Sequence, residues 1–395
     1  MLRTQSKSIT KRKLLAKSWT HVHIGSGNDL GRWEYFFLND KLVLLDFDKL
    51  ALMTASKPSL IDEMTKAAED QSSSLHKFLS QHPDRSLSTQ LSKGDSKRTL
   101  PPQLRAGNKS KILMLKLMTG SPSVYIPGSS VKGALRTAYL VNQLKNGKIS
   151  LPDRRRNSRG DKGYLDALKR SVNAQFNEMR SPENQLFQHI LIADSKVFDE
   201  SKLGIAKVEA ASGGASQRGN RAHSGRGGQK QQLDIYCEVL RSEMEFELEF
   251  AARVEKIDKS LIRPIETLLE IADKFYRSVW DEEKQARVGE RQNQDLGDFY
   301  ADQEPPEDGY LIRLGYGSGQ MSTSMLVPYR EKYRNEFEKY ADEPLRTGPI
   351  YRKRPELLDR SPYPFTAKCA LADDGYEDPV GQPMGWIVIS KEVVN

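Results

Sequence analysis

The stretch Tyr125–Leu140, YIPGSSVKGALRTAYL, has the pattern of a turn that leads into a helix. Pro127 and Gly128 mark the turn, because proline and glycine punctuate secondary structure. Ser129 or Ser130 is expected to cap the helix by accepting hydrogen bonds from backbone N–H groups. Apolar residues then recur at the spacing of one helical face, which predicts that this face is buried: Val131, Ala134, Leu135 and Ala138.

Two cations share another face of this predicted helix. Lys132 and Arg136 are four residues apart, which places them on the same side of a helix. Both lie near the helix start, where unpaired backbone N–H groups favour anions. The segment is therefore a candidate site for a phosphate backbone. The alternative interpretation is an ordinary capped surface helix that happens to carry one lysine and one arginine.

Two glycine-rich segments lie on either side of this helix in the sequence. His21–Gly27, HVHIGSG, follows a predicted first strand, and Leu314–Gly319, LGYGSG, follows a predicted strand at Tyr310–Leu314. Glycine permits positive φ and close approach to a ligand, and five glycines are candidates: Gly25, Gly27, Gly315, Gly317 and Gly319. Tyr316 could stack on a base. No Gly-Lys-Ser or Gly-Lys-Thr follows, so the sequence does not support a P-loop nucleotide hydrolase.

His21 and His23 flank Val22 and would share one face of a strand. Either imidazole could act as the general base of a metal-independent ribonuclease. The favoured interpretation is a hydrogen-bonded structural histidine beside a glycine turn. The histidines and the two cysteines show no metal-binding spacing, so we expect no metal and no cofactor.

Composition indicates the kind of partner. The chain has 395 residues and a formal net charge of +8, which favours an anionic partner, nucleic acid first. We expect no membrane contact, because there is no apolar run of about 18 residues. The basic N-terminus lacks the apolar core of a signal peptide, and the two cysteines lie far apart, which fits a reducing cytoplasm.

The quoted motifs closely resemble those of the RAMP superfamily, the repeat-associated RNA-binding subunits of CRISPR effector complexes. IPGSSVKGALRTA resembles the superfamily signature, HVHIGSG the motif after the first strand, and LGYGSG the late glycine-rich loop. Leu191–Ser195, LIADS, resembles the short segment after the signature helix, and its Asp194 is expected to make a structural turn or cap bond. Tyr363–Thr366 and Pro383–Trp386 are similar to the tail of the fifth subunit of type III-A Csm complexes.

Strands alternate with helices in both halves of the chain, and the resemblance implies an α+β fold of two ferredoxin-like (RRM-like) domains with insertions. Gly213–Gln232, GGASQRGNRAHSGRGGQKQQ, is basic and nearly devoid of apolar residues, which predicts a flexible linker or loop. We therefore expect an N-terminal domain at 1–212 with the signature helix, the segment 213–232, and a C-terminal RRM-like domain at 233–395 with the glycine-rich loop.

Local patterns predict several further elements. Asn39-Asp40-Lys41 predicts a hairpin between two apolar stretches, and the alternation of residues 244–250 predicts a strand with one buried face. Pro264 is tolerated in the first turn of a predicted helix at 261–280. The remaining expectations are a strand at 111–118, helices at 60–68 and 75–79, and loops at 81–110 and 285–306.

The resemblance implies a non-catalytic CRISPR RNA-binding subunit of a type III-A Csm complex. Such a subunit caps the backbone filament near the 3′ side of the guide and aids guide maturation. Its expected partners are CRISPR RNA, the other Csm subunits and host nucleases that trim the guide. RNA contacts are expected at His23, Gly25, Gly27, Ser129, Ser130, Lys132, Arg136, Gly315, Tyr316, Gly317 and Gly319.

Two alternatives stay open from the sequence. One is a metal-independent endoribonuclease that processes CRISPR RNA with His21 or His23 as its base. The other is a related RAMP subunit of another type III complex. The backbone subunit that resembles this chain cuts target RNA with a loop aspartate, and Asp29 is the nearest candidate here. Because Asp29 does not match that context convincingly, we expect no catalytic residue and no enzyme.

Overall fold

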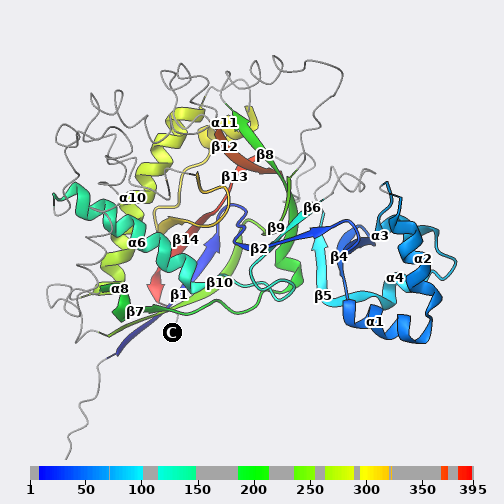
Figure 1. Ribbon diagram of the computed structural model, residues 1–395. Coiled ribbons are helices and arrows are strands. Elements are labelled where there is room, and N and C mark those ends of the chain that lie inside the picture. Colours follow the sequence, from blue (N-terminus) through cyan, green and yellow to red (C-terminus); the bar gives the residue numbers. More distant parts are fainter. Residues whose placement is uncertain are drawn as a thin grey trace, which may run out of the picture.

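The computed structural model describes residues 9–70, 72–100, 114–147, 186–212, 235–253, 263–288, 294–319, 322, 366–371 and 381–393. Within these ranges the chain is mixed α/β, with two curved sheets and helices packed against them (Figure 1). The predicted mixture of helices and strands is confirmed at this level. Among the described helices, none combines the length and the apolar character that crossing a membrane requires.

The first sheet has five strands in the order β11-β14-β1-β10-β7, and each neighbouring pair is antiparallel. Its strands are β1 (Ile9–Ser18), β7 (Ile190–Ile192), β10 (Met244–Arg253), β11 (Gly309–Arg313) and β14 (Trp386–Val393). The predicted one-sided burial of β10 is confirmed, because its apolar residues Phe246, Leu248 and Phe250 are buried. The opposite face of β1 and β10 carries lysines and glutamates, so it stays open to water.

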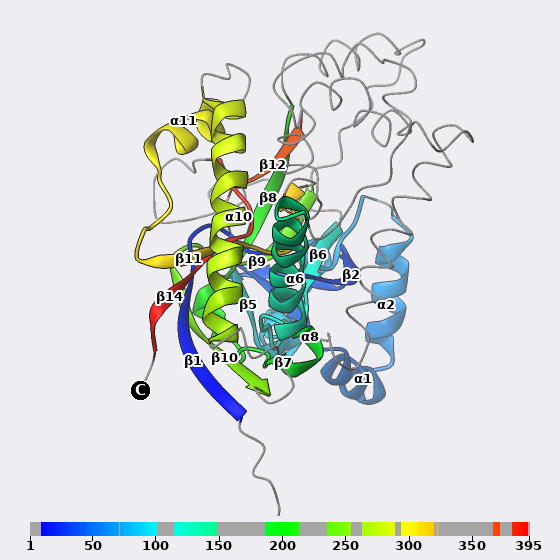
Figure 2. The same cartoon turned by 90° about the vertical axis from the view of Figure 1, so that its left-hand side faces the viewer.

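Two long helices cover the apolar face of this sheet. Helix α6 (Gly128–Lys145) and helix α10 (Pro264–Arg287) lie side by side, as Figure 1 and Figure 2 both show. The four apolar residues predicted to face inward on α6 are all buried, which confirms that pattern. Pro264 stands at the start of α10 as predicted, because a first-turn residue needs no intrahelical N–H bond.

The region after α10 differs from the predicted polar loop at 285–306. Helix α10 continues to Arg287, and a further helix, α11 (Gln294–Asp302), follows within the predicted loop. The apolar residues of α11 are few, yet Leu296 and Tyr300 are buried, and the Tyr300 ring lies 4.6 Å from that of Trp280. Tertiary packing therefore fixes a helix that its polar sequence did not indicate.

The second sheet has nine strands, seven of them in the order β2-β6-β9-β8-β5-β4-β3, with β12 paired to β8 and β13 paired to β12. The strands are β2 (Gly25–Gly31), β3 (Tyr35–Leu38), β4 (Lys41–Leu45), β5 (Ser92–Thr99), β6 (Met114–Met118), β8 (Leu203–Ser212), β9 (Ile235–Leu240), β12 (Thr366–Leu371) and β13 (Gln382–Pro383). The predicted β3–β4 hairpin is confirmed. Asn39 and Asp40 have φ of 49° and 55°, the positive values that a tight hairpin turn requires.

Strand β5 lies inside the stretch 81–110 that was predicted to be a loop, so that prediction is wrong for residues 92–99. The strand has no apolar alternation. Its place in the sheet depends instead on the ladder with β4 and on Arg98, a buried side chain whose partner comes from β9. A polar strand of this kind is specified by a distant residue and not by its own pattern.

Short helices follow β4 and form a separate cluster at the right of Figure 1. They are α1 (Phe47–Ser56), α2 (Ser59–Ala68), α3 (Leu75–Gln81) and α4 (Leu87–Gln90), and they pack on β3 and β4 through a small core of their own. The helices predicted at 60–68 and 75–79 are confirmed, whereas α1 was not foreseen. The remaining short elements are α8 (Leu186–His189) and the 3-10 helix Glu200–Lys202.

Both sheets combine strands from the two sides of the segment 213–232. Strand β1 pairs with β10 and β14, and β8 pairs with β9 and β12. The sheets therefore do not confirm two ferredoxin-like domains. Residues 213–232 themselves lie outside the described residues, and the division into 1–212 and 233–395 stays a prediction.

Candidate nucleic-acid interface

Two of the predicted segments meet in space. We call them the HIGSG turn (His23–Gly27) and the glycine loop (Leu314–Gly319), and we call their meeting place the glycine junction. The Tyr316 N–H donates to the His23 carbonyl at 2.7 Å, and the two rings meet edge to face at 5.7 Å. The C-terminal run joins them, because the Gly385 N–H donates to the His21 carbonyl at 2.8 Å. The junction therefore brings together the beginning and the end of the chain.

The glycines of the junction have different roles. Gly315 has φ of +75°, and a Cβ on it would lie 2.1 Å from the His23 carbonyl oxygen. Gly317 likewise faces Met384, at 2.8 Å. Glycine is needed at these two positions because another segment of the same chain packs directly against the backbone. Gly27 also has positive φ, +84°, yet nothing lies within 4 Å of its missing Cβ. Gly27 thus leaves open space for a ligand, whereas a Cβ on the exposed Gly25 would lie 3.2 Å from Nε2 of His23.

Both histidines of the motif are buried and hydrogen-bonded. His23 is 2% exposed, and its Nδ1 lies 2.6 Å from the Glu238 carbonyl oxygen, which requires a proton on Nδ1. Burial lowers the pKa of His23, so the ring is neutral at pH 7. His21 accepts a hydrogen bond on Nδ1 from the Ser242 N–H at 2.9 Å. Among the described residues, no group of three histidine, cysteine, aspartate or glutamate side chains could hold a metal ion.

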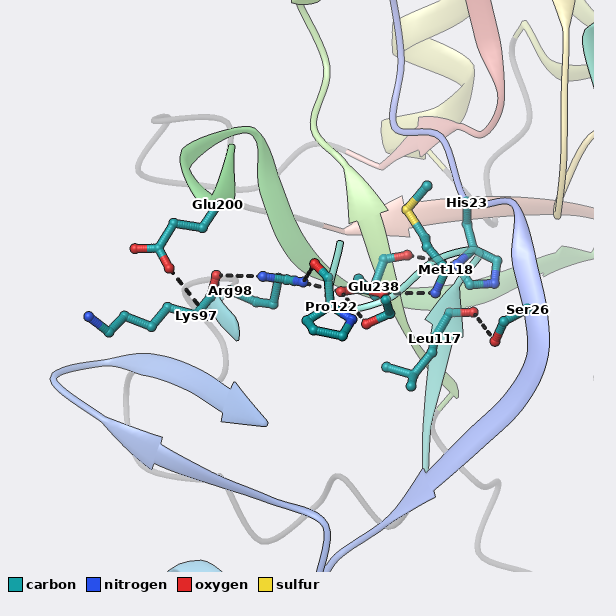
Figure 3. A network of polar contacts seen from close by, with 10 residues as sticks. His23, Ser26, Lys97, Arg98, Leu117, Met118, Pro122, Glu200 and Glu238 are labelled. Carbon is teal, nitrogen blue, oxygen red and sulfur yellow. Dashed lines mark hydrogen bonds and ion pairs between the residues drawn. The ribbon is translucent and has the colours of Figure 1, made fainter. Parts of the chain in front are cut away.

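A buried ion pair supports the junction from behind. Arg98 Nε of β5 lies 2.5 Å from Glu238 Oε1 of β9, and both side chains are fully buried (Figure 3). Glu238 Oε2 accepts from the Met118 N–H at 2.8 Å, and Arg98 donates to the Pro122 carbonyl at 2.9 Å. Because the Glu238 carbonyl also binds His23, this pair ties the HIGSG turn to the end of β6.

A second buried ion pair holds the glycine loop. Arg313 Nη1 lies 2.6 Å from both carboxylate oxygens of Glu283 on α10. The same guanidinium donates to the Met384 carbonyl at 2.9 Å and to the Gly317 carbonyl at 3.2 Å. Tyr300 donates to Glu283 at 2.5 Å. Buried charged groups therefore fix the loop backbone. The outer face of the loop is thus held in one conformation before any ligand binds. Gly319, exposed and at φ of +74°, ends the loop beside Glu283.

The start of the signature helix differs from the prediction. Helix α6 begins at Gly128, its N-cap is Pro127, and no side chain of the cap makes a bond. The predicted serine cap is therefore wrong, because Ser129 and Ser130 already lie inside the first turn. The expected structural bond of Asp194 is confirmed instead. Its carboxylate accepts from the Gly128 N–H at 2.8 Å, so a protein anion occupies the helix start.

The two cations of α6 lie on its outer side. Lys132 is half-buried, and burial followed by repulsion from Arg136 lowers its pKa. Arg136 and Ser129 are exposed, and Ser130 is half-buried. The predicted RNA-contacting residues thus form two groups. One lies at the glycine junction, where Tyr316 and Gly317 are half-buried and Gly315 is exposed, and the other lies on α6.

One polar pair at the junction was missed as a binding feature by sequence reasoning. Lys116 of β6 stands directly opposite Asp29 of β2, with Nζ 3.2 Å from Oδ2. Their side chains are 35% and 30% exposed. The available signal was a lysine that interrupts the apolar run KILMLKLM, between Leu115 and Leu117, which pack in or against a core.

Comparison with known proteins gives a family and a fold. The model of the RAMP superfamily matches residues 16–320. No curated protein shows significant sequence similarity to the chain. A chain of the cryo-EM structure of a Csm-crRNA-target RNA ternary complex of a type III-A CRISPR-Cas system is similar, with a TM-score of 0.61, 20% identity and coverage of 96% of this chain and 100% of that one. The crystal structure of T. onnurineus Csm5 is similar with a TM-score of 0.60, 20% identity and coverage of 95% and 99%.

Proposed function

The chain belongs to the RAMP superfamily, and on that premise we propose that it is a non-catalytic CRISPR RNA-binding subunit of a type III-A Csm effector complex. The similarity of fold extends over nearly the whole length of two proteins from Csm systems. In the proposed assembly this subunit caps the backbone filament near the 3′ side of the guide. Its partners are CRISPR RNA, the other Csm subunits and host nucleases that trim the guide.

The observation that carries the proposal is the glycine junction. Two buried ion pairs fix its backbone from behind, while Gly25 and Gly27 leave its front exposed. A fixed, exposed backbone with cations nearby can hold phosphates without reading bases. Such contacts leave the guide bases free to pair with target RNA. Binding of this kind is weakly sequence-specific and weakens as the salt concentration rises, because the release of counterions from the RNA then becomes less favourable.

The burial of both histidines supports the non-catalytic part of the proposal. A general base must reach the proton that it removes, within hydrogen-bond distance of substrate. His21 is fully buried and His23 is 2% exposed, and each uses Nδ1 for a protein hydrogen bond. Asp29 is engaged by Lys116. The purified protein is therefore expected to bind repeat-containing RNA and to leave it uncut, with or without metal.

A double substitution tests the contribution of α6. Lys132→Ala with Arg136→Ala should weaken binding of a repeat-containing RNA measured by fluorescence anisotropy over a salt series. If each cation contacts one phosphate, the slope of log affinity against log salt should fall by about 1.4, at about 0.7 per phosphate. The melting temperature should change little, because surface substitutions usually shift stability by under about 0.5 kcal/mol.

The matched control removes the same charge elsewhere. The control variant combines Lys13→Ala with Lys17→Ala. Both lysines lie on the open face of the first sheet, and each side chain is 37% exposed. This variant should keep most of the RNA affinity. An equal loss of RNA affinity in both double variants would mean that the α6 substitutions act through net charge and not through a contact made by α6. A wild-type protein that fails to bind RNA at any salt concentration, or that cuts it at a defined position, would contradict the proposed function.

A further inference from the structure

The ion pair of Lys116 and Asp29 lies beside the glycine junction. Its atoms approach at 3.2 and 3.3 Å, and both side chains are about one-third exposed. Asp29 belongs to the exposed strand β2, two residues after Gly27. The lysine ammonium is therefore held at the edge of the exposed surface around the open Gly27.

The sheet register places Lys116 on the same face as the glycine loop. Lys116 pairs directly with Cys237 of β9, and Cys237 belongs to a small core cluster against which Tyr316 packs. Burial dominates the pKa shifts of His23 and Tyr316, lowering the first and raising the second. The charges of Lys116 and Asp29 act on the pKa of both side chains as well, in opposite directions. The ion pair and the two rings, which contact each other edge to face, thus belong to the same region of the second sheet.

The charge at this place depends on the pair alone among these four neighbours. Burial lowers the pKa of His23, so this ring is neutral at pH 7. The Tyr316 hydroxyl is neutral at pH 7 like any tyrosine, and burial raises its pKa further. Lys116 and Asp29 cancel one another in the free protein. An anion that takes the place of Asp29 would meet one positive charge, open backbone and an aromatic ring.

We propose that Lys116 binds an RNA phosphate at the glycine junction and that Asp29 holds this lysine in place until the phosphate displaces it. Half-exposed ion pairs are weak, since water and salt screen them, so the exchange of one anion for another is easy. The backbone beside Gly27 lets the phosphate approach, and the half-buried Tyr316 lies in the glycine loop nearby, where its ring can contact the adjacent nucleotide. This inference rests on the proposed RNA-binding function and assigns its contact residue.

Replacing Lys116 and replacing Asp29 should change RNA affinity in opposite directions. An ion pair with only a structural role would not show this difference. With a fluorescent single-stranded RNA of CRISPR-repeat sequence and the full chain, Lys116→Ala should weaken binding and lower the salt slope by about 0.7. Asp29→Asn should tighten binding by about two- to fivefold, because it removes the competing carboxylate. Lys116→Arg should bind like the wild type, since it keeps the charge.

The exposed pair of Lys13 and Glu247 supplies matched controls, with Nζ and Oε1 2.7 Å apart on the first sheet. Lys13→Ala and Glu247→Gln change net charge equally and should leave binding nearly unchanged. If Asp29→Asn binds no tighter than Glu247→Gln, or Lys116→Ala no weaker than Lys13→Ala, the inference is wrong while RNA binding by the wild type still stands. If the wild type does not bind the RNA, the proposed function itself fails. Melting curves of each variant separate loss of binding from loss of folding.

Discussion

The glycine junction and the start of α6 are both built on close backbone approach, and they differ in what lies in front of them. A Cβ on Gly315 would lie 2.1 Å from the His23 oxygen, and one on Gly128 would lie 2.1 Å from the Ile192 oxygen. In front of the junction lie the open Gly27 and the side chain of Lys116. In front of the α6 start lies the Asp194 carboxylate, which takes the first N–H group of the helix.

This difference determines how each place can bind an anion. A phosphate at the α6 start would have to compete with a carboxylate that is part of the fold, so α6 can contribute through Lys132 and Arg136 but poorly through its first N–H group. At the junction the competing carboxylate belongs to a half-exposed side chain, Asp29, which can move away. A helix start with the right cations is thus not by itself an anion site.

The largest expected effect comes from the buried pair behind the junction. Glu238→Gln should destabilise the protein by about 3–5 kcal/mol, because it removes a negative charge that is paired with the fully buried Arg98 guanidinium. Chemical denaturation measures this loss. Glu247→Gln on the open sheet face is the control and should change the denaturation midpoint little. The double variant Arg98→Met with Glu238→Met should be more stable than Glu238→Gln, and the opposite order would show that the pair itself is not what holds the junction.

A smaller effect separates the two kinds of glycine at the junction. Gly27→Ala should cost about 1–2 kcal/mol from backbone strain alone, since the residue has positive φ but open surroundings. Gly315→Ala should cost clearly more, because the His23 carbonyl must also move and the bond to the Tyr316 N–H weakens. Thermal denaturation of the two variants compares them directly. Equal losses would mean that the close contact at Gly315 relaxes freely.

The smallest expected effect concerns the start of α6. Asp194→Ala should destabilise the protein by about 1 kcal/mol, as loss of a helix cap does. Ser129→Ala should be close to neutral, because that exposed hydroxyl makes no cap bond. Denaturation midpoints again provide the measurement. A loss at Ser129 as large as that at Asp194 would restore the serine cap that the sequence predicted.

Short-range patterns predicted much of the fold correctly. The tight turn at Asn39 and Asp40, the buried face of α6 and the alternation of β10 all follow from residues within a few positions of one another. The sequence patterns failed at β5 and α11, whose polar residues take a regular structure only because Arg98 and Tyr300 are buried by distant partners. The serine cap failed because a carboxylate from another segment took its place.

The glycine-rich segments, the signature helix with its buried face and its two cations, and the family of these motifs can all be read from the amino-acid sequence. That the HIGSG turn and the glycine loop meet, and that Lys116 faces Asp29 across 87 residues of chain, is visible only in the folded protein. The two kinds of feature depend on forces of different range along the chain. Turn chemistry and helical periodicity act between near neighbours, whereas ion pairs and backbone contacts between strands exist only after the sheets have brought remote residues together.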